Sequence, residues 1–209
     1  MCGQVCRLLM LDEGYIKYEI TWEKGPIPQG AGLADMLTCR SRLFSRNLIG
    51  HNLDLGVGFG NISIRSQALG EFIISGTQTG HLDPLESRHC TLVTEFDIEQ
   101  NSLCCFGPVK ASSESLTHAA VYAAKADIGA VIHVHHLGYW QKWKDKVPTT
   151  PENAAYGTPE MALAVADLFA HTSVAQIGFF VMGGHEEGLI AFGKTIQEAE
   201  QALIPYVSG

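Results

Sequence analysis

Strand-like and helix-like patterns alternate along this chain, and no linker separates them. The clearest are three strand-like runs and two helical ones, at residues 90–95, 102–106, 130–135, 33–48 and about 112–126. Such alternation is typical of a sheet covered by helices. We therefore predict one α/β domain over residues 1–209. Residues 1–30 would add an N-terminal strand arm, since residues 7–10 are apolar and residues 15–22 alternate.

Composition narrows the class of protein. With 209 residues, of which 46% are hydrophobic and 17% charged, the chain can bury one substantial core. A formal charge of −8 argues against a nucleic-acid partner, because such surfaces are usually basic. No apolar run is long enough to span a bilayer, and the first residues are too poor in basic side chains for a signal peptide. Six cysteines without paired spacing suit free thiols. We expect a cytoplasmic protein with a small-molecule substrate.

Two histidines end the most apolar of the predicted strands. His133 and His135 follow the run 130–132 and are separated by Val134. Alternate side chains of a strand share one face, so both imidazoles should point the same way while Val134 is buried. Two imidazoles on a rigid strand can hold a divalent metal. His136 should face the other way, with a structural or supporting role.

A catalytic metal site requires a third protein ligand and an open coordination position. His185 is the best candidate, because it lies in a glycine-flanked loop after a buried strand. Glu114 would begin the predicted helix behind a serine N-cap, Ser112 or Ser113, where the helix dipole favours negative charge. His118 lies one helical turn later and is predicted to orient that carboxylate.

Three segments offer small donors for an anion. They share glycine, serine, threonine or asparagine beside exposed backbone N–H groups, and they are residues 60–63, 77–80 and 112–113. The last is also a predicted helix N-terminus, which binds phosphate or carboxylate readily.

Taken together, these motifs resemble one known family. Gly60-Asn61-Ile62-Ser63, Thr79-Gly80, Ser112-Ser113-Glu114 and His133-Val134-His135, in this order and at these separations, are similar to the class II aldolase/adducin family. The resemblance runs from about Leu33 to Val207. It implies a three-layer αβα sandwich with a central, largely antiparallel sheet, and a homotetramer with active sites between subunits.

The resemblance also assigns roles to residues. It implies that His133, His135 and His185 hold zinc or another divalent metal, and that Glu114 is the acid/base group. The remaining site residues would bind the substrate phosphate, namely Asn61, Thr79, Gly80, Ser112 and Ser113. The implied reaction is aldol cleavage or formation of a small sugar phosphate through an enediolate. Epimerisation and dehydration would use the same site, whereas adducin-like members are assembly modules without the metal histidines.

Besides the extra strand-like arm before the first predicted helix, two features differ from the family's aldolases. There the third zinc histidine directly precedes a glycine, whereas here Glu187 precedes Gly188 and His185 lies two residues earlier. Either the loop bulges to bring His185 in, or Glu187 replaces it, or the metal site is altered. Some members also use a catalytic tyrosine from a neighbouring subunit, for which Tyr139 and Tyr156 are the candidates here.

Overall fold

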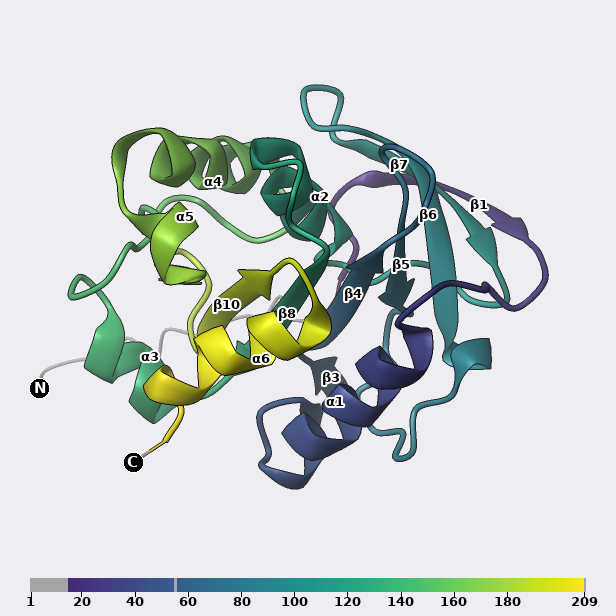
Figure 1. Cartoon of the computed structure of the whole chain (residues 1–209), viewed down its shortest axis with the longest axis horizontal. Coiled ribbons are helices and arrows are strands. Elements are labelled where there is room, and N and C mark those ends of the chain that lie inside the picture. The colour runs from purple at the N-terminus through teal and green to yellow at the C-terminus, as the bar shows by residue number, and fades with distance from the viewer. Residues whose placement is uncertain (1–14, 55, 209) are drawn as a thin grey trace, which may run out of the picture.

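A mixed sheet of eight strands forms the centre of the computed structural model, which describes residues 15–54 and 56–208 (Figure 1). The strand order is β1-β7-β6-β5-β4-β8-β10-β9. Its strands are β1 (Glu19–Lys24), β4 (Asn61–Arg65), β5 (Phe72–Ser75), β6 (Cys90–Asp97), β7 (Ser102–Gly107), β8 (Ala130–His135), β9 (Phe179–Val181) and β10 (Gly188–Gly193). A separate hairpin pairs β2 (Gly50–Asn52) with β3 (Val57–Phe59).

All neighbouring strands of the large sheet run antiparallel except one pair. The exception is β1, which lies parallel to β7 at one edge with Glu19 opposite Ser102. The predicted strand at residues 7–10 lies outside the described residues, as do Cys2 and Cys6. The extent of the domain over residues 1–209 stays a prediction.

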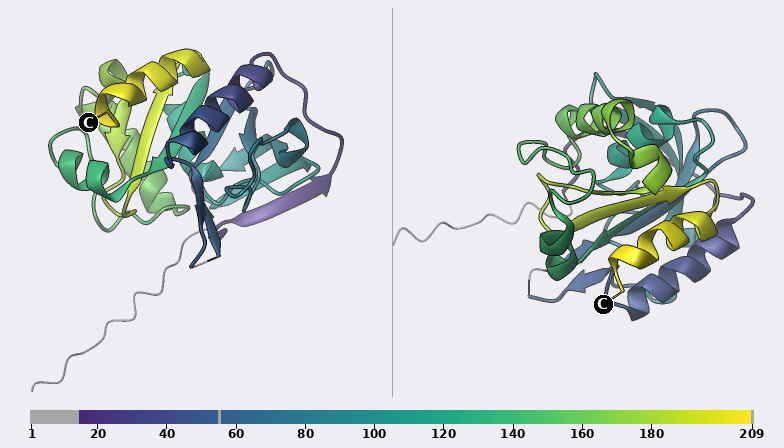
Figure 2. Two further views of the ribbon diagram at one scale, coloured as in Figure 1. Left: turned by 90° about the horizontal axis from the view of Figure 1, so that it is seen from below. Right: turned by 60° about the vertical axis from the view of Figure 1, so that its left-hand side comes forward.

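Helices cover both faces of this sheet. The right-hand view of Figure 2 shows the sheet between α2 (Ser115–Ala124) and α4 (Pro159–His171) on one side and α1 (Leu33–Ser45) and α6 (Ile196–Leu203) on the other. The shorter helices are α3 (Leu137–Trp143), α5 (Val174–Ile177) and the 3₁₀ turns at Ser87–His89 and Ile204–Tyr206. This arrangement confirms the predicted three-layer αβα sandwich with a largely antiparallel sheet.

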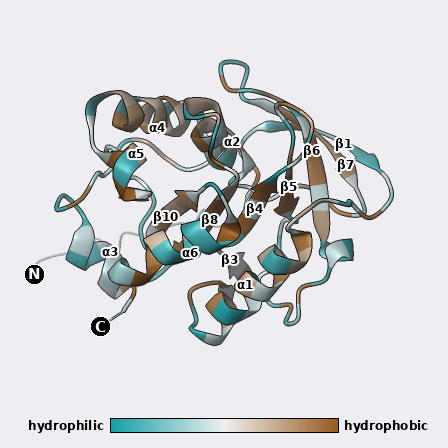
Figure 3. Cartoon of the chain, in the orientation of Figure 1, coloured by the Kyte–Doolittle hydropathy of each residue, from teal (hydrophilic) through white to brown (hydrophobic). Residues whose placement is uncertain are grey.

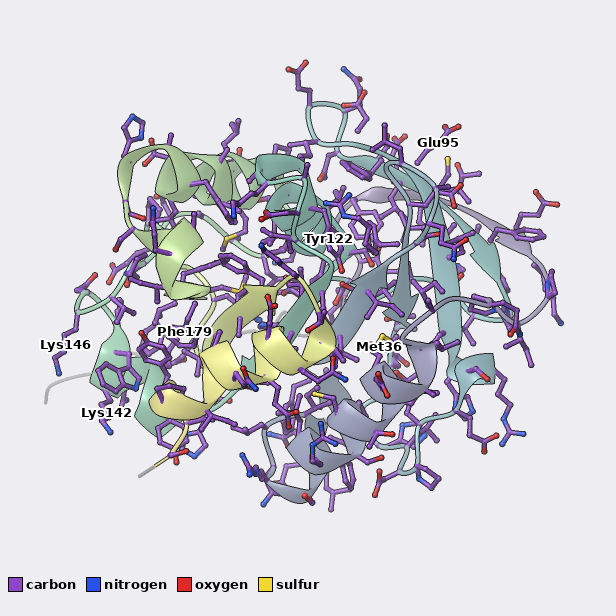
Figure 4. The ribbon with its side chains drawn as sticks, in the orientation of Figure 1. Met36, Glu95, Tyr122, Lys142, Lys146 and Phe179 are labelled. Atoms are coloured by element: carbon purple, nitrogen blue, oxygen red, sulfur yellow. The ribbon has the colours of Figure 1, made fainter. Side chains whose placement is uncertain are left out.

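The core has two halves because strand side chains alternate between faces. On β8, Ile132 and Val134 pack in the cluster beneath α1 and α6, whereas Val131 packs in the cluster beneath α2 and α4. Figure 3 shows the resulting apolar colouring of the central strands. In Figure 4, Met36 and Phe179 lie in the interior, whereas Lys142 and Lys146 project from the surface. His133 and His135 therefore share the face covered by α2 and α4.

Two helices begin at threonine N-caps, and the predicted cap of a third is corrected by the structure. Thr158 caps α4 by accepting the N–H of Met161, and Thr195 caps α6 by accepting that of Glu198. The predicted serine cap of α2 is wrong, because α2 begins at Ser115 with Glu114 as its N-cap. The side chain of Ser112 instead accepts the N–H of Glu114 at 3.4 Å within the preceding turn.

Two further observations concern the whole described chain. Residues 15–54 and 56–208 contain no helix long and apolar enough to cross a membrane. The four described cysteines are free thiols, and Cys104 is the only one of these four that is not buried.

Candidate metal and substrate site

Strand β8 places two imidazoles on the same buried face of the sheet. His133 and His135 are almost completely buried, and Val134 between them points to the opposite core, as the alternation predicts. Across the sheet, Asn61 at the start of β4 is the register partner of His133. The Oδ1 atom of Asn61 is buried without a hydrogen-bond partner among the described residues. This oxygen could therefore accept a hydrogen bond from a bound molecule.

His185 reaches these two histidines from a tight loop between β9 and β10. The backbone N–H of His185 donates to Met182 O at 3.2 Å, and that of Gly188 donates to His185 O at 2.9 Å. Glu187 has a φ of 70°, in the left-handed region. A Cβ on Gly188 would lie 2.6 Å from the ring of His185, so a glycine is needed there. The loop thus bulges and turns His185 inward.

The three imidazoles converge through their Nε2 atoms. The Nε2 atom of His135 lies 2.9 Å from that of His133 and 3.1 Å from that of His185. Three nitrogens bound tetrahedrally to one zinc ion at the usual bond length would be about 3.3 Å apart. The donor set therefore fits a divalent metal, and no other group of three such side chains lies together in residues 15–54 and 56–208.

Burial keeps the three imidazoles neutral, as metal ligands must be. It lowers the pKa of His133 to about 4. Burial, followed by the charges of neighbouring histidines, lowers the pKa of His135 and His185 well below the usual range, and the charge of Lys17 adds to the effect on His185. The Nδ1 atom of His133 lies 3.2 Å from Leu189 O, which can only accept. Nδ1 therefore carries the proton, and the Nε2 lone pair faces the other two rings.

Glu114 lies against this cluster. Its Oε1 atom is 3.4 Å from Nε2 of His185, and its Oε2 atom accepts the hydroxyl of Thr117 at 2.8 Å. The predicted pairing with His118 is wrong. The Nδ1 atom of His118 instead lies 2.7 Å from Oγ of Ser63, deeper in the core. A carboxylate fixed by Thr117 beside the histidine cluster is well placed to move a proton.

A pocket of about 350 Å³, its open mouth included, joins the histidine cluster to the three small-residue segments. The site residues that line it are His133, Glu114, Asn61, Thr79, Gly80, Ser112 and Ser113. Lys and Arg are absent from its described lining, so an anion would be held by neutral donors. His135 and His185 adjoin it through His133 and Glu114.

Close backbone packing and one buried arginine hold the turn at Thr79 and Gly80. A Cβ on Gly80 would lie 2.0 Å from Gly50 O, so only glycine fits beside β2. Arg40 of α1 donates to Gly80 O at 2.8 Å and to Thr79 O at 3.4 Å, and it is paired with Asp83 at 3.4 Å. The sequence offered no signal for Arg40, because its partners are about 40 residues away.

Of the remaining candidates, Tyr156 lies beside His185, whereas Glu187 and Tyr139 lie outside the histidine cluster. The Oε2 atom of Glu187 lies 3.9 Å from Nδ1 of His135, on the ring edge that faces away from the cluster. The ring of Tyr156 is 4.6 Å from that of His185 and is buried. Tyr139 packs instead on His136, whose Nδ1 accepts the N–H of Tyr139 and caps α3.

Comparisons with known proteins agree with this fold. Residues 43–139 match the model of the Class II Aldolase and Adducin N-terminal domain. That match includes Glu114 and both histidines of β8, whereas His185 lies outside it. No curated protein matches the sequence.

Solved structures share the fold at low sequence identity. An L-fuculose 1-phosphate aldolase aligns with a TM-score of 0.62 and 17% identity, covering 87% of this chain and 84% of that one. YgbL from Klebsiella pneumoniae, described as a putative aldolase/epimerase/decarboxylase, aligns with a TM-score of 0.60 and 18% identity over 83% and 84%. A sugar-phosphate aldolase from Thermotoga maritima gives 0.59 and 16% over 83% and 89%.

Proposed function

Because residues 43–139 match the class II aldolase and adducin family model, we propose that this chain is a metal-dependent lyase of that family. It cleaves or forms a carbon–carbon bond in a small sugar phosphate or related hydroxy-carbonyl compound, through an enediolate. The observation that supports this most strongly is the convergence of three buried imidazoles beside Glu114, at the end of a pocket lined by small donors.

In this proposal His133, His135 and His185 hold the metal, with zinc as the first candidate. When bound, the metal supplies Lewis-acid stabilisation of negative charge on substrate oxygens. Three protein ligands leave open coordination positions for the substrate. The low pKa of each imidazole, caused by burial, keeps all three in the neutral form that binds metal near pH 7.

Glu114 removes or returns the proton of the reacting carbon or hydroxyl. Thr117 holds one carboxylate oxygen, and the other faces His185. The phosphate group of the substrate is held at the other end of the pocket by neutral donors, which are Asn61, Thr79, Gly80, Ser112 and Ser113. Binding energy gained there positions the reacting carbon beside Glu114.

The same residues would serve epimerisation or dehydration, and the pocket lining does not favour one over another. In an adducin-like assembly module the three buried imidazoles would have no function. Burying polar rings costs free energy, so hydrophobic residues would be expected in their place. We also propose a cytoplasmic homotetramer in which neighbouring subunits complete each site, as in the family.

Aldol cleavage should be measured on a panel of ketose 1-phosphates and pentulose phosphates, with coupled detection of the released aldehyde. We expect cleavage of at least one substrate by the zinc-loaded protein. A chelator should abolish it, and zinc added back should restore it, because the metal is required to stabilise the enediolate. Cleavage that survives complete removal of metal would refute the proposal.

A further inference from the structure

The segment before β1 reaches the candidate site from outside residues 43–139. Tyr18 is buried, and its hydroxyl donates to Ser112 O at 2.7 Å. The side-chain amide of Asn101 donates to Lys17 O at 2.9 Å, and Asn101 O accepts the N–H of Glu19 at 2.9 Å. These bonds fix the backbone on both sides of Lys17 and therefore fix the position from which its side chain extends.

The side chain of Lys17 extends from there toward the third histidine. Its ammonium group lies 3.9 Å from the ring centroid of Tyr156. The Tyr156 ring is in turn 4.6 Å from the ring of His185. Cation, phenol ring and imidazole thus contact one another in series.

The backbone beside Tyr156 packs against this lysine. Gly157 has a φ of 68°, and a Cβ there would lie 3.6 Å from Cβ of Lys17 and 3.1 Å from Ser113 O. The arm, the segment before α4 and the turn before Glu114 therefore pack together. The charge of Lys17 is also close enough to His185 to contribute to its low pKa, after burial and His133.

We propose that Lys17 is a positioning residue of the metal site, acting through Tyr156 on His185. The cation holds the Tyr156 ring, and that ring fixes the orientation of an imidazole carried by a loop. Groups that orient a ligand in this way raise metal affinity, because the ligand loses less freedom on binding. This inference rests on the proposed function, since it assumes that His185 binds the metal.

The direction in which zinc affinity changes when Lys17 is replaced distinguishes a positioning role from simple charge repulsion. A positive charge near a dication repels it, so removing the charge alone should tighten zinc binding. Lys17→Met keeps the length of the side chain and removes the cation. We expect about 10-fold weaker zinc binding, the lower end of what loss of an orienting partner costs. Lys17→Arg should restore the affinity, because guanidinium also binds aromatic faces.

Zinc affinity should be measured on the full chain by competition with a chromophoric chelator. The matched control is Lys24→Met, an exposed lysine at the end of the following strand β1, which should leave the affinity unchanged. The imidazole resonances of His185 in the metal-free protein give a second measurement. They should shift in Lys17→Met and stay in place in Lys24→Met.

The outcomes separate this inference from the proposed function. Unchanged or tighter zinc binding in Lys17→Met, with the His185 resonances unmoved, would overturn the positioning role and leave the lyase proposal intact. A wild-type protein that binds no zinc would refute the metal site and with it the positioning role at that site, even if the His185 resonances responded to Lys17→Met. Weak binding that Lys17→Arg does not restore would also count against it.

Discussion

Replacing His133 with alanine is expected to abolish zinc binding and aldol cleavage together. His133 lies between the other site residues: its Nε2 atom is 2.9 Å from that of His135, and it lines the pocket beside Glu114. Two remaining imidazoles leave an incomplete ligand set, and loss of a ligand should cost more than the 10–100-fold typical of its supporting partners. Metal content and cleavage rate should be measured on the same preparation.

The control for this variant is His171→Ala. His171 is exposed at the end of α4, where its side chain makes its polar contacts with Asp167, and the His171→Ala protein should keep full metal content and activity. Circular dichroism should show that His133→Ala is folded, since the substitution also removes a bond to Leu189 O. A folded His133→Ala protein that still binds zinc stoichiometrically would contradict the assigned role.

Replacing Glu114 with glutamine should lower turnover by about 10²–10⁴-fold, the range for loss of a general acid/base. Glutamine is nearly isosteric and can still accept the Thr117 hydroxyl, so the local structure should persist. Zinc should stay bound, because the three imidazoles are unchanged. The cleavage rate at saturating substrate and the zinc content are the two measurements.

Glu186→Gln is the matched control, because Glu186 is an exposed carboxylate close to His185 in sequence. This substitution should change neither the cleavage rate nor the zinc content. An inactive Glu114→Gln protein that has also lost its zinc would assign Glu114 to metal binding instead of proton transfer. A fully active one would remove Glu114 from the mechanism altogether.

The parts of the site that the sequence predicts well depend on local periodicity. The alternation of residues 130–135 is enough to place His133 and His135 on one face and Val134 on the other. The glycine-flanked loop predicts that His185 can turn inward, and the structure favours this over the alternative of Glu187, whose carboxylate lies at the other edge of the His135 ring.

The failures have a common physical cause, which is competition from contacts distant in sequence. His118 was predicted to pair with Glu114 one turn away, but Ser63 of the neighbouring strand offers a buried hydroxyl at 2.7 Å. The helix α2 starts later than a serine cap predicts, because Ser112 O is taken by Tyr18 and by Ser115. No local pattern marks Arg40 or Lys17, whose partners are brought close only by the folded sheet.

The most direct test of a three-histidine metal centre is elemental analysis of the purified protein beside His185→Ala and Glu187→Ala. We predict near-stoichiometric zinc, or another divalent metal, in the wild type and in Glu187→Ala, and its loss in His185→Ala. Metal lost in Glu187→Ala but kept in His185→Ala would move the third ligand to Glu187. A wild-type protein without metal, even after zinc is supplied, would contradict the account as a whole.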